Sequence, residues 1–506
     1  MAEPYNPDEA RAALDEAKRY AADNADTPAA AEGWVYAAEL FERGADRDAY
    51  AASQAIQCYR KAGRTADALR IGASAVAEFP HDNWVRGHTA WAEYDRAKAA
   101  GDNVEDALDA LGRMIDLMGA LDDPSMHAEQ AYWRIWRLVP RPPRDGYESS
   151  GPTDPQVLDF LASRFEALFR AAPAVRRQGD RGDRESAKEL LARLAAREFR
   201  AAARWDDLAF AMELATEAFP THTDFAAARI TALLELGKAA DASQAGDDAL
   251  RDKPDPMLVR LVARAYCVQH RFSEAAATLL AGCYQFRDVW LWRDLAGVRW
   301  TTGDIAGANR ALAIALRLLA RERDAVREEL QARFHQGRAT NSLRLEDAHT
   351  AAMEAVAAER AGATANLDNA KMLELMEALG ADHADLLAEA REMPPAELTA
   401  TLEGIWAEER EAELEIGLRA ATVSHIDTAK GFGYVIVSSD HDAGDEPGDP
   451  EGERASFSVR AIEGGPERIG RIEVGSPVRV LLARALDLRD PNYTPMRAVI
   501  VRPVDD

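Results

Sequence analysis

The spacing of apolar positions along the chain changes once, near residue 420. Before that point, apolar residues recur three and four positions apart, which is the period of amphipathic helices that pack against one another. After it, apolar and polar residues alternate, which is the period of β-strands. Glycine and proline separate the alternating runs, which fall at 422–426, 433–437, 455–459, 477–482 and 496–501. The pattern predicts a long helical region followed by five short strands.

A repeating unit runs through part of the helical region. Ala203, Gly237, His270 and Gly303 mark one position of this unit and lie 34, 33 and 33 residues apart. Small residues follow at fixed distances, as Ala308 follows Gly303 after five positions. A small residue at the mark permits a tight turn, and the small residues that follow let two helices approach closely. The spacing therefore predicts a series of helical hairpins.

These spacings resemble the tetratricopeptide repeat (TPR), a helix–turn–helix unit of about 34 residues. The resemblance covers about 190–335 and, with Gly63 at the mark, about 30–120. It implies a mostly α fold, a TPR-like α-helical solenoid whose concave surface binds a protein partner. The sequence does not identify this partner, and it does not indicate an oligomeric state.

A segment rich in proline, glycine and serine, 141–155, interrupts the helical pattern. Such a composition is typical of a linker. We therefore expect four parts in the chain. They are N-terminal TPR-like hairpins over 1–145, a central TPR-like solenoid over 155–335, further helices that cap the solenoid over 336–418, and a small all-β barrel over 419–506.

The five strands carry the most specific motif of the chain. A closed barrel is the economical arrangement for five strands that have no helix to cover a face of the sheet. The second strand begins with Lys430-Gly-Phe-Gly-Tyr-Val435, which matches the ribonucleoprotein-1 pattern, whose aromatic side chains stack on nucleic-acid bases. An RNA-recognition motif would also need helices between its strands, and the pattern after Val435 predicts none. Residues 421–504 resemble a cold-shock domain, a barrel of the OB type.

The cold-shock resemblance implies a set of nucleic-acid-binding residues: Lys430, Phe432, Tyr434, Phe457 and His425. Lys430 would meet a phosphate and the aromatic rings would stack on bases of single-stranded RNA or DNA. The chain also departs from the family. His425 and Ile426 replace a usual Trp-Phe pair, and the second aromatic motif is one residue short. Each lost stacking residue costs ~1–3 kcal/mol, so a barrel that no longer binds nucleic acid is the alternative.

An acidic insertion, 440–453, follows the second strand and carries seven Asp and Glu residues. It is either a solvated surface loop or an acidic lid that competes with nucleic acid for the binding face. The whole chain has 61 Lys and Arg against 87 Asp and Glu, a net charge of −26. This charge excludes a protein that holds duplex nucleic acid by overall attraction. It does not exclude a stacking surface, because the insertion alone more than accounts for the net −5 of residues 421–506.

A second candidate site lies in the helical region. Trp133, Arg134, Trp136 and Arg137 combine aromatic rings with guanidinium groups. This basic and aromatic patch could stack bases or hold an acidic peptide. The alternative is an ordinary helix surface with ion pairs between residues four apart.

Signatures of the common enzyme classes are missing from the sequence. It contains no GxxxxGK[ST], HExxH or GxSxG motif, which excludes the usual nucleotide-hydrolase, zinc-protease and serine-hydrolase patterns. The ten histidines are scattered, and single ones such as His335 on a helix are expected to be structural. We therefore expect a protein that is not an enzyme and has no metal or other cofactor.

The cysteines, the start of the chain and the length of its apolar runs indicate the cellular compartment. Cys58, Cys267 and Cys283 form no CxxC pair, so we expect reduced thiols and a cytoplasmic location. The start of the chain lacks the features of a secretory signal, and no apolar run approaches the ~18 residues of a membrane helix. The sequence thus predicts a bacterial-type adaptor that binds a protein and single-stranded nucleic acid. The alternative is a pure protein-interaction scaffold, for example a subunit of a larger complex.

Overall fold

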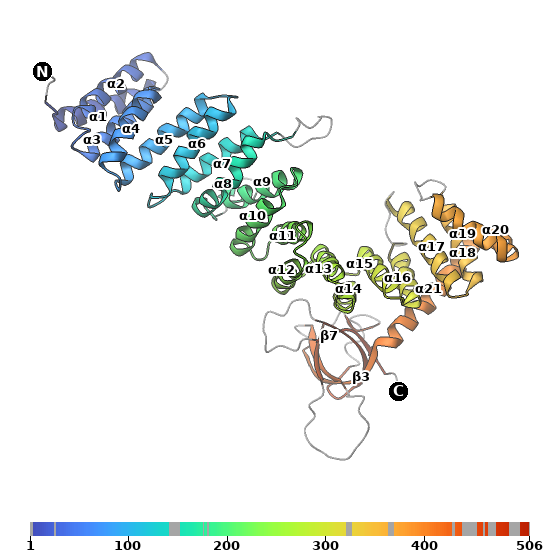
Figure 1. Cartoon of the computed structure of the whole chain (residues 1–506). Helices are drawn as coiled ribbons and strands as arrows, with labels where there is room; N and C mark the ends of the chain where they lie inside the picture. The colour runs from blue at the N-terminus through green and yellow to red at the C-terminus, as the bar shows by residue number, and fades with distance from the viewer. Residues whose placement is uncertain are drawn as a thin grey trace. The chain divides into compact units, whose positions relative to one another are not determined.

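The computed structural model forms two compact units, Met1–Phe219 and Pro220–Asp506 (Figure 1). The predicted boundary near 145–155 falls largely outside the described residues, which are 4–24, 27–140, 152–175, 177–179, 182–319, 326–362, 369–427, 431–437, 453–458, 461–463, 472–484 and 496–504.

The first unit is helical apart from one short hairpin. Its described elements are α1 (Pro7–Asn24), α2 (Pro28–Glu42), α3 (Ala49–Lys61), α4 (Thr65–Glu78), α5 (Asn83–Ala99), α6 (Val104–Met118), α7 (Ser125–Leu138), α8 (Pro155–Ala171), β1 (Arg177–Gly179), β2 (Gly182–Arg184), α9 (Ala187–Ala201) and α10 (Trp205–Ala218).

Side-chain caps fix where several of these helices begin. The Asp82 carboxylate accepts a hydrogen bond from the Val85 amide (2.8 Å) at the start of α5. Ser186 and Glu189 form a reciprocal capping box at the start of α9. Such caps satisfy amide groups that have no partner inside the helix. Helices α5 and α9 therefore begin where the sequence supplies a polar side chain.

The second unit combines helices with the predicted barrel. Its described elements are α11 (Thr223–Glu235), α12 (Ala239–Asp252), α13 (Pro256–Val268), α14 (Phe272–Phe286), α15 (Val289–Thr301), α16 (Ile305–Leu319), α17 (Val326–Arg344), α18 (Ala348–Gly362), α19 (Asn369–Asp382), α20 (Ala384–Glu392), α21 (Pro395–Gly417), β3 (Leu418–Asp427), β4 (Phe432–Val437), β5 (Glu453–Ser458), β6 (Pro477–Arg484) and β7 (Met496–Pro503).

The turns inside the helical hairpins lie at the predicted positions. Gly63, Ala203, Gly237, His270 and Gly303 all have positive φ, between 52° and 85°. They separate α3 from α4, α9 from α10, α11 from α12, α13 from α14, and α15 from α16. A single left-handed residue of this kind lets the chain reverse direction directly after a helix. The predicted mostly α fold of TPR-like hairpins is confirmed.

Small residues allow the two helices of a hairpin to pack closely. A Cβ atom added to Gly282 of α14 would lie only 2.7 Å from Cγ1 of Val259 on α13. The repeat residues Ala242, Ala275 and Ala308 are buried. The small residues that mark the repeat in the sequence thus lie at the helix contacts, where a larger side chain would force the helices apart.

The predicted five-stranded barrel is also confirmed. Its strands close in the order β3-β4-β5-β7-β6, with β6 returning to pair with β3. Only β5 and β7 run parallel, and the other pairs are antiparallel. Inward side chains, among them Val423, Val435, Phe457, Val480 and Val501, form one hydrophobic core. Closure leaves the outer face of the sheet as the surface on which a ligand can lie.

The barrel is joined to the helices of its own unit by α21, which continues directly into β3 (Figure 1). Leu414 of α21, Leu418 of β3 and Leu481 of β6 form a small buried cluster. Tyr284 of α14 packs against this cluster. These contacts hold the barrel against α14 and α21.

Candidate nucleic-acid interface

Three aromatic side chains lie together on the outer face of the barrel. His425 on β3 pairs with Tyr434 on β4, and Phe432 precedes Tyr434 by two positions. The ring of His425 lies 6.2 Å from that of Phe432 and 6.1 Å from that of Tyr434, centroid to centroid. The rings of Phe432 and Tyr434 are 5.8 Å apart and nearly perpendicular. We call these three residues the aromatic face.

The strand alternation explains why these rings point outward. Along β4, Gly433, Val435 and Val437 are buried, whereas the residues between them are partly exposed. A register shift between Val423 and His425 marks a bulge in β3. A bulge re-aims the residues that follow it, and here it brings an exposed His425 beside Tyr434.

Short and cationic side chains flank the aromatic face on β5. Ser456 pairs with Tyr434, and Ser458 pairs with Phe432. The guanidinium carbon of Arg454 lies 5.5 Å from the centroid of the Tyr434 ring. This distance is within the range of a cation–π contact. The surface therefore combines flat rings, small hydroxyl groups and one positive charge, a combination that suits stacked bases and their phosphates.

The predicted stacking role of Phe457 is wrong in this structure. Its side chain is only 2% exposed and belongs to the barrel core. Phe457 pairs with Gly433, which is also buried, and the ring of Phe457 points inward. Because the second aromatic motif is one residue short, the strand alternation turns its phenylalanine into the core and leaves Ser456 and Ser458 outside.

We expect Gly433→Val to destabilise the barrel, because Gly433 leaves room for the buried ring. A Cβ atom at this position would lie 2.5 Å from Cζ of Phe457 and 2.7 Å from the His425 carbonyl oxygen. Overpacking of this kind costs ~1–3 kcal/mol. Amide hydrogen exchange of β4 and β7 in the full chain should accelerate, while the outward control Ser458→Ala should leave it unchanged. Exchange at the wild-type rate in the valine variant would show that the ring does not fill this space.

Two predicted features of the interface lie outside the described residues. Lys430 belongs to residues 428–430, and most of the acidic insertion belongs to 438–452. The phosphate contact of Lys430 and the role of the insertion therefore stay predictions.

The basic and aromatic patch of the first unit is only partly as predicted. Arg134 is buried, and its side chain donates hydrogen bonds to the carbonyl oxygens of Ala97 (3.0 Å) and Gly101 (2.5 Å). These carbonyls end α5, where backbone acceptors lack helical partners. Arg134 is therefore a structural residue that joins α7 to α5 and is not available to a ligand. The rings of Trp133 and Trp136 lie 6.1 Å apart, and Arg137 is exposed.

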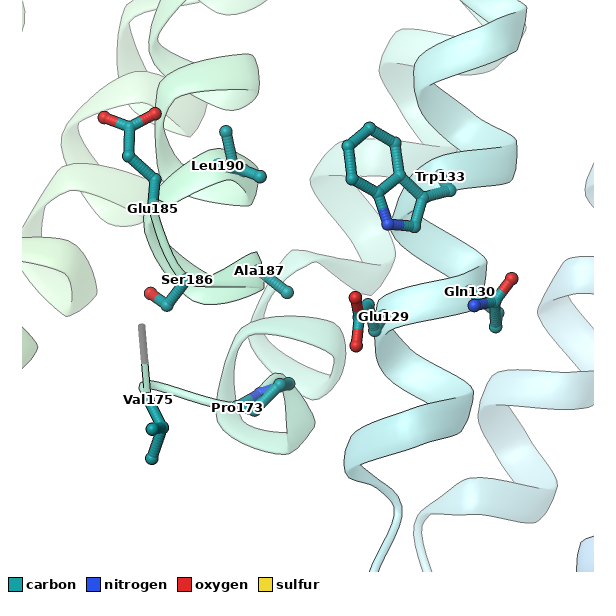
Figure 2. A pocket seen from close by; sticks show the side chains of 9 residues that line it. All are labelled: Glu129, Gln130, Trp133, Pro173, Val175, Glu185, Ser186, Ala187 and Leu190. Carbon is teal, nitrogen blue, oxygen red and sulfur yellow. The ribbon is translucent and has the colours of Figure 1, made fainter. Parts of the chain in front are cut away.

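Trp133 also borders a cavity of about 540 Å³ between α7 and the start of α9 (Figure 2). Its apolar wall includes Pro173 and Leu190, which lie opposite the indole ring in Figure 2. Glu129 and Glu185 supply the charged groups of the lining. Glu185 also forms an ion pair with Arg193 (2.9 Å). The cavity therefore combines an apolar wall with carboxylates that already have partners.

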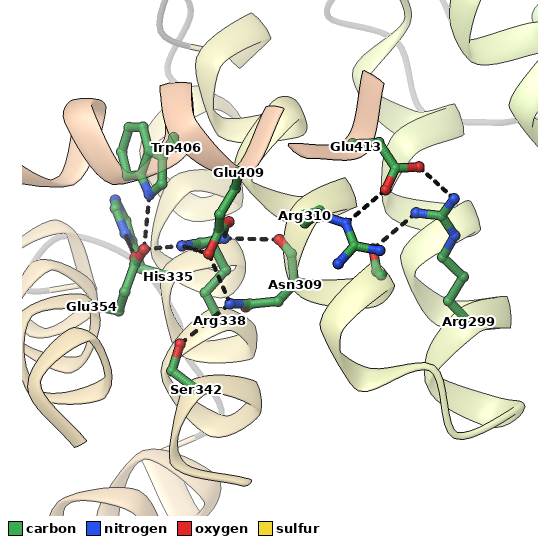
Figure 3. Close-up of polar contacts among 11 residues, drawn as sticks. Arg299, Asn309, Arg310, His335, Arg338, Ser342, Glu354, Trp406, Glu409 and Glu413 are labelled. Atoms are coloured by element: carbon green, nitrogen blue, oxygen red, sulfur yellow. Dashed lines mark hydrogen bonds and ion pairs between the residues drawn. The ribbon is translucent and has the colours of Figure 1, made fainter. Parts of the chain in front are cut away.

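A buried network of charges connects α21 with α17 and α18 (Figure 3). At its centre, the Glu354 carboxylate is fully buried and accepts hydrogen bonds from Arg338 Nε (2.5 Å) and Trp406 Nε1 (2.8 Å). His335 Nδ1 lies 2.6 Å from the other Glu354 oxygen. The structural role predicted for His335 is confirmed. Arg338 has no exposed surface and also donates to Glu409 Oε2 (2.5 Å).

A second part of the network lies nearer the barrel. Glu413 of α21 accepts hydrogen bonds from Arg299 (2.5 Å) and Arg310 (2.8 Å). Two residues further along α21, Glu415 accepts from Arg479 of β6 and Arg502 of β7, both at 2.6 Å. Carboxylates of α21 therefore bind arginines of the helices at one end and arginines of the barrel at the other. The sequence showed these acids only as members of a densely charged helix.

Burial limits the reactivity of two of the three cysteines. Cys58 and Cys283 are buried, and Cys267 is partly exposed. Burial raises the pKa of the Cys58 thiol to about 12. Since the thiolate is the nucleophile, such thiols are inert near neutral pH.

In the described part of the chain, no three His, Cys, Asp or Glu side chains cluster in a way that could hold a metal ion. Of the helices described, none is long and apolar enough to span a membrane.

Comparisons with known proteins find likenesses among solved structures alone. No family model matches the sequence, and no curated protein matches it. Among solved structures, a match is found to the crystal structure of a tetratricopeptide repeat protein from Parabacteroides merdae ATCC 43184 at 2.39 Å resolution. The sequence identity is 11% and the TM-score 0.26, and the match covers 65% of this chain and 97% of that chain.

Proposed function

We propose that this chain is a non-enzymatic adaptor that binds single-stranded nucleic acid with its barrel and a protein partner with its helical hairpins. The observation that carries the proposal is the outward grouping of His425, Phe432 and Tyr434 within 6.2 Å of one another. Rings on the outer face of a closed barrel contribute little to its core. They do offer flat surfaces to unpaired bases, at ~1–3 kcal/mol for each stacked base.

The ligand is single-stranded because only unpaired bases expose their faces. A duplex would offer its phosphates alone, and the net charge of −26 opposes their capture. The positive charge of Arg454 lies beside Tyr434, where it can approach the phosphate of a stacked nucleotide. Stacking therefore supplies most of the affinity, and the few charges orient the strand.

The helical hairpins supply the protein-binding part of the proposal. The cavity beside Trp133 has an apolar wall and two carboxylates, Glu129 and Glu185. A long side chain of a partner would place its apolar stem on the indole and the apolar wall. Repeats of helical hairpins commonly present such partner sites on their surfaces.

A pure protein-interaction scaffold is the second candidate function. The core position of Phe457 favours it, because the barrel then presents two aromatic rings and one imidazole in place of a larger stacking surface. In this case the barrel would serve only as a structural module held on α14 and α21.

An equilibrium titration separates the two functions. The full chain is added to fluorescent single-stranded RNA, single-stranded DNA and a duplex of the same sequence, and anisotropy is recorded at low and at physiological salt. We expect saturable binding of a single strand and much weaker binding of the duplex. The absence of single-strand binding at tens of micromolar protein and low salt would contradict the adaptor and leave the scaffold.

A further inference from the structure

The strand registers place an arginine at the end of the aromatic face. His425 of β3 pairs with Tyr434 of β4, Tyr434 with Ser456 of β5, and Ser456 with Arg497 of β7. Residues that pair across neighbouring strands point to the same side of the sheet. Ala498, the next residue of β7, is buried, which places Arg497 on the outer side. One row of side chains therefore crosses four strands and ends on a guanidinium group.

A cleft opens where this row ends. Its volume is about 860 Å³, and it lies between the barrel and the end of α14. Ser458 and Arg497 line its barrel side, and Arg287 and Arg410 line its helical side. A smaller cavity of about 330 Å³ shares Arg287 and Arg410 and adds Arg317. Since Ser458 also pairs with Phe432, the aromatic face and the cleft are parts of one continuous surface.

The lining of the cleft is positively charged, although the chain as a whole is negatively charged. The two cavities are lined by four arginines and one carboxylate, that of Glu463. Arg502, which is not part of the lining, donates a hydrogen bond to Glu463 (2.6 Å) and also pairs with Glu411 and Glu415. Arg410 lies 3.9 Å from the same carboxylate. In a protein with a net charge of −26, such an excess of guanidinium groups marks a place for an anion.

Arg287 is held at the rim of the cleft by the backbone. It ends α14 in the left-handed conformation, with φ of 54°, and its amide donates to the Cys283 carbonyl oxygen (3.1 Å). Its side chain is exposed. The guanidinium group can therefore meet a ligand in the cleft without a change of the helix.

We propose that the cleft holds the sugar–phosphate backbone of a single strand whose bases stack on the aromatic face. The strand would leave Phe432 and Tyr434, pass Ser458 and Arg497, and reach Arg287 and Arg410 of the helices. Guanidinium groups suit this role, because their fork of N–H donors matches phosphate oxygens. The binding site then belongs to the barrel and the helices together. This inference rests on the proposed function and extends its ligand beyond the barrel.

The test compares short and long strands on the full chain. Site sizes on barrels of this kind are about 4 to 16 nucleotides, so labelled single strands at these two lengths are titrated. We expect Arg287→Gln with Arg410→Gln to weaken binding of the long strand about tenfold or more and to leave the short strand unchanged. The slope of log affinity against log salt should fall by about 1.4, or ~0.7 for each lost phosphate contact.

Matched variants keep the test decisive. Arg251→Gln with Arg264→Gln removes the same charge from two exposed arginines that do not line the cleft and should leave both strands unaffected. Arg287→Gln alone tests the cleft without the Arg410–Glu463 contact between α21 and the barrel.

The outcomes separate the cleft proposal from the proposed function. If the wild type binds both strands and every variant binds them equally, the cleft proposal is wrong and the stacking function stands. If the wild type binds neither strand, the proposed function fails and the cleft proposal fails with it. Equal weakening of both strands by the cleft variant would also contradict the proposal.

Discussion

Arg338→Met is expected to lower the free energy of unfolding of the second unit by about 3–5 kcal/mol. Arg338 is fully buried and donates to the carboxylates of both Glu354 and Glu409 at 2.5 Å. Methionine has a similar length but no charge, so both carboxylates would lose their arginine partner. Glu354 has no exposed surface, so water cannot replace the hydrogen bond that it loses.

An exposed ion pair provides the matched control for this effect. Arg391 lies 3.3 Å from Glu359, and both side chains are about half exposed, at 50% and 48%. Arg391→Met should therefore cost below about 1 kcal/mol. Urea unfolding followed by circular dichroism, with hydrogen exchange of α17 and α18, measures both variants. A cost for Arg338→Met as small as that of the control would mean that the buried network does not stabilise this unit.

Acid should weaken the same network in a defined pH range. Burial alone would raise the pKa of Glu354, but Arg338, His335 and Trp406 lower it from 4.5 to about 2. A carboxyl whose pKa is lower in the folded state stabilises the fold above its unfolded pKa and loses this contribution as pH falls. The free energy of unfolding should thus decrease between pH 4.5 and pH 2. Glu354→Gln should flatten this part of the profile, and an unchanged profile would contradict the assignment.

The repeat could be predicted from the sequence because the conformation at each of its positions depends on residues that are close in the sequence. Ala203, Gly237, His270 and Gly303 are the left-handed residues between paired helices, and such a turn depends only on the few residues around it. The five strands were predictable for the same reason, since alternation with a period of two is a local pattern. Closure into a barrel could be predicted because the sequence between the strands has no helical pattern.

The positions of single side chains were less predictable, because they depend on distant partners. Phe457 turns inward because its strand pairs with Gly433, more than twenty positions earlier. Arg134 is drawn into the interior by the carbonyl oxygens at the end of α5. Glu354 meets Trp406 across 52 positions, and nothing in the local sequence separates it from the many exposed acids of the helices. Long-range contacts decided these three cases.

Replacing Phe432 and Tyr434 of the aromatic face should have the largest effect on binding. We expect Phe432→Ala with Tyr434→Ala to weaken single-strand affinity at least about 30-fold, because each stacked base contributes ~1–3 kcal/mol. The two rings are partly exposed and lie on the outer face of β4. Their removal should therefore leave the barrel folded, and circular dichroism and hydrogen exchange of β4 provide the check.

Two controls separate stacking from other causes of weaker binding. Tyr434→Phe keeps the ring and should bind nearly as the wild type does. Ile436→Ala removes a neighbouring outward side chain of the same strand that has no ring to stack. Affinity that survives the double alanine variant would rule out stacking on these rings. An equal loss for Ile436→Ala would point to damage of the strand instead.

The central claim is that bases of a single strand contact the outer face of β4. Photocrosslinking of the full chain to a single-stranded RNA that carries 4-thiouridine, followed by trypsin digestion and mass spectrometry, tests it most directly. We expect the crosslinked peptide to be Gly431–Arg454, with the nucleotide on Phe432 or Tyr434. Crosslinks confined to helical peptides, such as the one that ends at Arg134 and contains Trp133, or no crosslink to any peptide, would contradict the claim.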